Sequence, residues 1–181
     1  MGPRIWAAMG VASLAWGTTG VATRGALNAG VPPVGLVTIR SILAAVIIYG
    51  LLAARRRRIR IDRGRLILGG MMAVTNLALP FILFTLALQY ASAGFVGLLV
   101  ALVPLLTATF AHFLLPDEPL SIAKLTGLAV GVAGVVLLLG SGDSGLAEGG
   151  RPLAAAVLSV LAAASISYAA VYAKGRSVGY D

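Results

Sequence analysis

The chain has 181 residues, of which 59% are hydrophobic and only 11% are charged. A soluble domain is nearer half apolar and a quarter charged, so this composition excludes an ordinary soluble protein and indicates a multi-pass membrane protein. The net charge of +8 does not indicate nucleic-acid binding, because seven arginines lie together in residues 55–65 between two apolar runs. A short arginine-rich loop of this kind is typical of the cytoplasmic side of a membrane.

The first apolar run, residues 5–21, predicts an uncleaved transmembrane helix. Trp16 lies about 18 Å from Arg4 by helical rise, which places it near mid-depth. Tryptophan prefers the membrane interfaces, so at this depth it either packs in the core or lines a cavity. Ser13 and Gly17 are four residues apart and form a pair of small residues that allows close helix approach.

A turn at residues 28–33 precedes the second predicted helix, residues 34–54. Arg40 lies about 10 Å inside this helix. A charge at the bilayer centre costs about 2.5–3.5 kcal/mol on insertion scales, and two interpretations of Arg40 remain open. Its side chain either reaches toward the nearby outer interface, or faces inward and meets anionic ligand groups or backbone carbonyls.

A very short connection joins two apolar runs, residues 66–89 and 93–115, which predicts a transmembrane hairpin. Each run contains a proline that interrupts its own helix. Pro80 leaves the carbonyl of Asn76 without its helical N–H donor, and Pro104 has the same effect in the second run. Both breaks fall near mid-depth, where irregular backbone needs protein or water around it. Interrupted helices at this depth are typical of transporter sites.

The fifth predicted helix, residues 122–139, contains glycines at one-turn spacing, and the sixth, residues 153–173, contains small residues at every fourth position. Within apolar helices such patterns mark faces that pack closely. A small, polar linker, residues 141–152, separates the two helices. The predicted packing residues, besides Gly17, are Gly127, Gly131, Gly134, Ala155, Ser159, Ala163 and Ser167.

The basic residues predict the orientation of the six helices. With both termini in the cytoplasm, all fourteen lysines and arginines lie on the cytoplasmic side except Arg24, Arg40 and Arg151. The reverse orientation would contradict the rule that cytoplasmic loops are positive. We therefore expect a protein of the cytoplasmic membrane with both termini inside and with Arg24 at the outer interface.

The sequence carries no constellation typical of an enzyme. It has no cysteine and one histidine, and its six acidic residues lie in loops, at helix ends or at the terminus. Without a carboxylate pair, a second histidine or a thiol, we predict no hydrolytic site, no metal site and no cofactor.

Taken together, several segments resemble the EamA family of the drug/metabolite transporter superfamily. The first are Trp16-Gly17, Pro32-Pro33 with Arg40, and residues 87–94 followed by Pro104-Leu105. The strongest block consists of Glu118, Lys124, Gly127, Gly131 and Gly134. The resemblance covers residues 5–139, the length of one five-helix repeat of that family.

Members of that family have ten helices, arranged as two inverted five-helix repeats around a central cavity. The resemblance therefore implies a repeat over residues 1–140, an external linker over 141–152 and the start of an incomplete second repeat over 153–181. It also implies a transporter that moves small organic solutes, such as metabolites, amino acids or drugs, by alternating access. The residues expected along the solute pathway are Trp16, Arg40, Asn76, Pro80 and Pro104.

A second hypothesis is a truncated, non-transporting membrane fragment or assembly partner that retains one repeat. If the rest of the second repeat is missing, some of the small-residue faces on the fifth and sixth helices are exposed to lipid. We then expect the chain to form a homo-oligomer or to pair with a second chain that completes the missing repeat.

Overall fold

The structure is a computed structural model that describes residues 3–55, 62–115, 121–140 and 151–177. Within these ranges it contains helices and turns and no strand. Helix α7 (Ile122–Gly140) has 19 residues and corresponds to the fifth predicted helix. The helical segments found long and apolar enough to span a membrane are Ile5–Asn28, Pro33–Ala54, Arg63–Tyr90, Ala93–Leu114 and Pro152–Arg176. The all-α polytopic fold predicted from the sequence is confirmed.

Helix α1 (Pro3–Asn28) ends in a turn that leads directly into α2 (Pro33–Ala54). Gly30 has φ +85°, a left-handed conformation that glycine adopts without steric cost. The N–H groups of Gly30 and Val31 donate to carbonyls in the last turn of α1, at 3.0 and 3.1 Å, as in a Schellman motif. The two helices are therefore joined by a defined turn.

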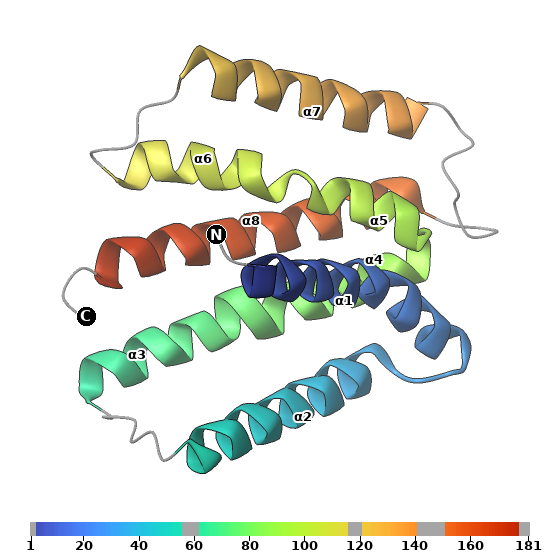
Figure 1. Ribbon diagram of the computed structural model, residues 1–181. Coiled ribbons are helices and arrows are strands. Elements are labelled where there is room, and N and C mark those ends of the chain that lie inside the picture. The colour runs from blue at the N-terminus through green and yellow to red at the C-terminus, as the bar shows by residue number, and fades with distance from the viewer. Residues whose placement is uncertain (1–2, 56–61, 116–120, 141–150, 178–181) are drawn as a thin grey trace.

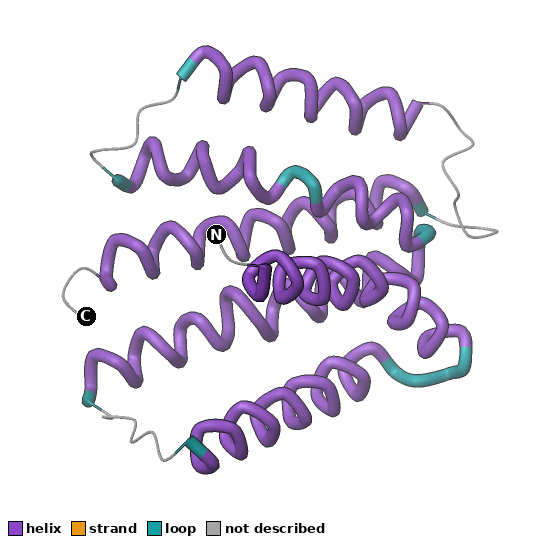
Figure 2. The backbone as a smooth tube through the Cα atoms, in the orientation of Figure 1, coloured by secondary structure: helices purple, strands orange, loops and turns teal. Residues whose placement is uncertain are grey.

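Both arms of the predicted hairpin are interrupted. The first arm consists of α3 (Arg63–Met72), a π-helical segment (Ala73–Ala78) and α4 (Leu79–Tyr90). The second arm consists of α5 (Ala93–Val100) and α6 (Val103–Leu114), separated by the short non-helical turn that Figure 2 shows. Each interruption ends one residue short of a proline, which is the second residue of the helix that follows, so the predicted helix breaks are confirmed.

Helix α8 (Pro152–Ser177) runs through the middle of the molecule. Figure 1 shows it between α5 and α6 on one side and α3 and α4 on the other. Helix α1 packs against α4 and α5, α2 packs against α4, and α7 lies outermost, next to α6. The arginines at 56–60, the turn at 116–120 and the linker at 141–150 lie outside the described residues.

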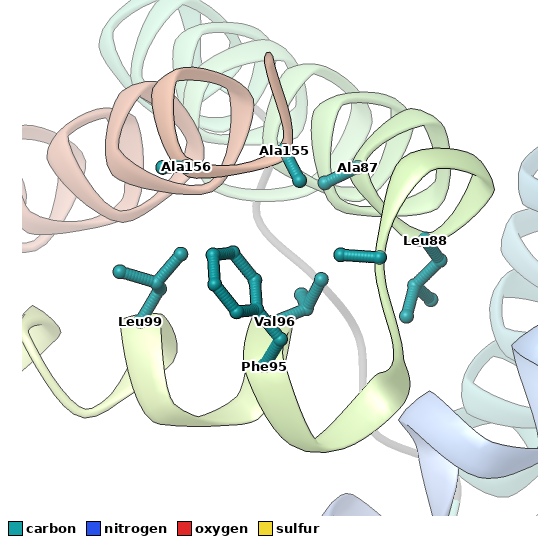
Figure 3. Packing of buried hydrophobic residues seen from close by; sticks show 8 residues of the cluster. Ala87, Leu88, Phe95, Val96, Leu99, Ala155 and Ala156 are labelled. Carbon is teal, nitrogen blue, oxygen red and sulfur yellow. The ribbon is translucent and has the colours of Figure 1, made fainter. Parts of the chain in front are cut away.

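The core lies where α4, α5 and α8 meet. Figure 3 shows Phe95 of α5 facing the small side chains of α8, with Leu99 and Val96 beside it. Alanines on α8 leave room for the larger side chains of α5 and bring the helix backbones close. The cluster consists of Ala87, Leu88, Ala91, Phe95, Val96, Leu99, Ala155 and Ala156.

The small-residue ladder of the sixth predicted helix is buried within the chain. Ala155, Ser159, Ala163 and Ser167 on α8 each have an exposed fraction of 0%. Of the small-residue faces expected to remain partly open to a second chain, this one is therefore covered within the chain. The reason is that α8 packs between the two arms of the hairpin instead of at the edge of the molecule.

The glycines of α7 and α1 differ in their surroundings. A Cβ atom on Gly127 would lie 3.4 Å from the side chain of Leu105, and one on Gly131 would lie 2.7 Å from it. These two glycines thus pack against α6 within the same chain. No atom lies within 4 Å of the corresponding position on Gly17 or Gly134, so the prediction of a close packing contact does not hold there.

A candidate solute cavity between helices α1, α2, α4 and α5

A cavity of about 370 Å³ lies between α1, α2, α4 and α5. Its volume falls within the usual range of small-molecule sites. Four helices contribute to the wall, which is apolar except for a few hydroxyl groups and one cation. The lining residues are Trp16, Gly17, Thr19, Gly20, Val21, Thr23, Arg40, Phe81, Phe84, Thr85, Leu88, Ala93, Gly94, Val96, Gly97 and Val100.

Helix α1 contributes a stripe of residues spaced three or four apart. Trp16, Gly20 and Thr23 recur at helical spacing, which places them on one face. Gly17 also lines the cavity, and this open space explains why no helix packs against it. A stripe of glycines and threonines next to a tryptophan leaves room beside the indole ring.

Arg40 faces inward and is half-buried. Its guanidinium carbon lies 4.1 Å from the centroid of the Phe81 ring, in cation–π geometry. Trp16 meets the same ring edge to face, with centroids 6.1 Å apart and an interplanar angle of 64°. Of the two interpretations of Arg40, the structure favours the inward one, and it places Trp16 in the wall of a cavity.

Arg24 holds α1 against the end of α4. Its guanidinium donates hydrogen bonds to the carbonyl of Leu88 and to the carbonyl of Ala91, the latter at 3.0 Å. The last carbonyls of a helix lack helical donors, and a cation at this end is also favoured by the helix dipole. The sequence placed Arg24 at the outer interface but gave no signal for this contact, because its partners lie 64 and 67 residues further along the chain.

The π-helical segment changes which carbonyl Pro80 leaves without a donor. The N–H of Leu79 donates to the carbonyl of Val74, five residues earlier. The next pair in this register would join the N–H of residue 80 to the carbonyl of Thr75. Because Pro80 has no N–H, the Thr75 carbonyl is left without a backbone donor. The sequence prediction named Asn76 because it assumed α-helical spacing. The hydroxyl of Ser165 on α8 donates to the Thr75 carbonyl at 2.6 Å.

A second serine of α8, Ser167, forms a hydrogen bond at the other interruption, between α5 and α6. In the turn before Pro104, two N–H groups donate three residues back, as in a 3₁₀ turn. The hydroxyl of Ser167 donates to the carbonyl of Val103 at 3.0 Å, and the hydroxyl of Thr107 donates to the same carbonyl at 2.7 Å. Irregular backbone inside a membrane is tolerated where protein satisfies it. Helix α8 does this for the Thr75 carbonyl, and at the second break it adds a hydrogen bond next to Pro104.

The five residues predicted along the solute pathway therefore separate into two groups. Trp16 and Arg40 line the cavity. Pro80 is fully buried, Asn76 is half-buried and Pro104 is exposed, and none of these three belongs to the cavity wall.

The fold and the cavity define a multi-pass, all-helical membrane protein with interrupted helices beside a pocket of ligand size. The model of the EamA-like transporter family matches residues 5–140. The chain therefore belongs to the EamA-like transporter family. The matched region contains every helix that lines the cavity, and α8 lies outside it. Comparison with curated proteins and with solved structures found no significant match.

Proposed function

We propose that this chain moves small organic solutes, such as metabolites, amino acids or drugs, across the cytoplasmic membrane by alternating access. Its family indicates a membrane transporter of the drug/metabolite type. The observation that supports a solute site is the cavity of about 370 Å³ with a single embedded cation, Arg40, in its described wall. A charge inside a membrane is expensive and usually marks a functional site.

Within this proposal the two groups of pathway residues act differently. Trp16 and Arg40 contact the solute. Asn76, Pro80 and Pro104 act through the helix interruptions, since a break lets the two parts of a helix tilt against each other. The interrupted helices α3–α4 and α5–α6 then carry the motion, and the cavity beside α4 and α5 changes its access.

The proposed orientation has both termini in the cytoplasm. The end of α2, the start of α3 and the end of α8 lie on one side of the molecule in Figure 1, and they carry Arg55, Arg63, Arg65, Lys174 and Arg176. Arg24, at the opposite end, is used within the fold. This asymmetry of charge supports the proposal, because basic residues near helix ends favour the cytoplasmic side.

A counterflow assay in proteoliposomes tests the proposed function. Vesicles containing the purified chain and an unlabelled mixture of amino acids, sugars and organic acids are given each radiolabelled solute in turn. We expect saturable exchange of at least one class of solute. Chain-free vesicles provide the control, and exchange no faster than in those vesicles for every solute would refute the proposal.

Two variants test the role of the interruption. Asn76→Leu and Pro80→Ala are expected to keep membrane expression near normal and to lower solute flux, because Asn76 lies in the π-helical segment, Pro80 lies just after it, and neither residue belongs to the cavity wall. Unchanged flux in both variants would assign the break to packing alone.

A further inference from the structure

The cavity wall contains three hydrogen-bond donors that have no acceptor among the described residues. The guanidinium of Arg40 makes the cation–π contact with Phe81 and no hydrogen bond or ion pair there. The indole N–H of Trp16 and the hydroxyl of Thr23 likewise make none, and the exposed fraction of Thr23 is 8%. Thr23 is buried, Arg40 is half-buried and Trp16 is 57% exposed. Polar groups withdrawn from water are normally hydrogen-bonded, so donors without acceptors that gather on one cavity wall favour a ligand with acceptor atoms.

The other hydroxyl groups of the wall, those of Thr19 and Thr85, already donate hydrogen bonds to backbone carbonyls of their own helices. Thr19 donates to the carbonyl of Ala15 at 2.9 Å, and Thr85 donates to the carbonyl of Phe81 at 2.7 Å. Their oxygens can now accept a further bond but cannot donate one. Acceptor atoms at different points of a ligand are therefore directed to Arg40, Trp16 and Thr23.

The charge of Arg40 has no counterion in the described part of the chain. Asp62 is the acidic residue in this part, and it pairs with Arg65 at 3.1 Å, at the start of α3. A guanidinium in an apolar cavity attracts anions more strongly than one in water, because the surroundings screen its charge less. Planar carboxylates match the donor geometry of arginine, whose paired N–H groups can bind both oxygens.

We propose that the cavity binds a small organic carboxylate, with its charged end on Arg40 and its apolar or aromatic body against Trp16, Phe81 and Phe84. A single cation balances a single negative charge, which favours a carboxylate over a doubly charged phosphate that would stay partly uncompensated. Thr23 lies roughly 10 Å from Trp16 along α1, so a second polar group at the far end of the ligand would meet its hydroxyl. This inference rests on the proposed function and specifies its substrate class.

Direct binding in lipid nanodiscs tests it without requiring transport. The chain contains two tryptophans, and Trp6 lies outside the cavity wall. In a Trp6→Phe background, Trp16 is the single fluorescent reporter in the wall. The probes are phenylacetate and benzoate, each compared with its uncharged amide of similar shape.

We expect at least one acid to change Trp16 emission saturably and to bind about tenfold or more tightly than its amide, as for a hydrogen bond to a charged group. Arg40→Gln should abolish this preference, and Arg40→Lys should retain part of it. Arg63→Gln removes a charge outside the cavity wall and should leave the preference unchanged.

Three results would overturn the inference: equal binding of acid and amide, a preference that survives Arg40→Gln, or no binding of any acid to the folded chain. The outcomes also separate this inference from the proposed function. Binding that prefers acids without any flux supports a carboxylate site and counts against transport. Flux of neutral solutes without a preference for acids supports transport and overturns the carboxylate site.

Discussion

Replacing Ser165 with alanine should destabilise the fold more than a surface change of the same size. The Ser165 hydroxyl donates to the Thr75 carbonyl at 2.6 Å, and Pro80 removes the N–H that this carbonyl would otherwise receive in the π-helical register. The apolar part of a bilayer offers no water as a substitute. Ser165→Ala therefore leaves a half-buried acceptor without a donor.

The expected loss of unfolding free energy follows from two ranges of known interaction energies. Interhelical hydrogen bonds in a membrane protein average about 0.6 kcal/mol and reach about 1.7 kcal/mol, whereas an unsatisfied buried group costs about 1–3 kcal/mol. Because no second donor to the Thr75 carbonyl is seen in the described part of the chain, we expect a loss of about 1.5 kcal/mol in the free energy of unfolding.

Ser167→Ala provides the matched control on the same helix. Its acceptor, the Val103 carbonyl, also receives the hydroxyl of Thr107 at 2.7 Å, so the carbonyl keeps a donor after the change. We expect a loss of about 0.5 kcal/mol, near the average of interhelical hydrogen bonds. Each variant removes one serine hydroxyl from α8. After Ser165→Ala the Thr75 carbonyl has no remaining side-chain donor among the described residues, whereas after Ser167→Ala the Val103 carbonyl keeps the hydroxyl of Thr107.

Unfolding by SDS in mixed micelles, followed by far-UV circular dichroism, measures both losses. A double-mutant cycle with Pro80→Ala isolates the proposed cause, because alanine restores a backbone N–H at that position. Ser165→Ala should then cost less in the Pro80→Ala background than in the wild type. Equal losses for Ser165→Ala and Ser167→Ala, together with no coupling to Pro80, would refute the reasoning.

Further predictions concern the cavity and the orientation. Gly97→Leu should block the cavity and lower solute binding at least about tenfold while the protein stays folded, since no atom lies within 4 Å of the Gly97 Cβ position; ligand titration and circular dichroism check this. Arg24→Gln should cost about 1–3 kcal/mol of unfolding free energy in SDS titrations, because it leaves carbonyls at the end of α4 without their charged donor. Single cysteines in residues 55–65 should resist an impermeant thiol reagent in intact cells, and those in residues 141–150 should react; labelling of the first segment from outside would reverse the orientation.

Local features of the sequence were sufficient to predict the helices and their breaks. Apolar runs determine the spans because every backbone group in a membrane must be paired within the helix. Pro80 and Pro104 interrupt their helices for reasons confined to one turn. The same local argument was wrong by one residue at Thr75, because nothing in the residues before Pro80 distinguishes π-helical from α-helical spacing.

Contacts between segments far apart in the chain could not be predicted from the sequence. The small residues of α8 showed that a close contact exists but not what it faces, since alanine and serine fit any neighbouring helix. The hydrogen bonds of Arg24 and the shared contact of Trp16 and Arg40 with Phe81 depend on how four helices are placed relative to one another. Trp16 and Arg40 were identified from their depth in the membrane, but Phe81 and Thr23 carried no such signal.

The two faces of α4 explain how a cavity persists beside a packed core. One face packs against α8, which also supplies a hydroxyl at each helix break. Leu88 and Val96 belong to both the core and the cavity wall, so packing on one side fixes the wall on the other. Arg24 fastens α1 to the same unit, whereas α2 is held mainly by Val37, its buried residue, and by the contact of Arg40 with Phe81. A solute that binds Arg40 therefore acts on the least attached of the four helices that line the cavity, which is where a small change in binding energy can alter access to the cavity.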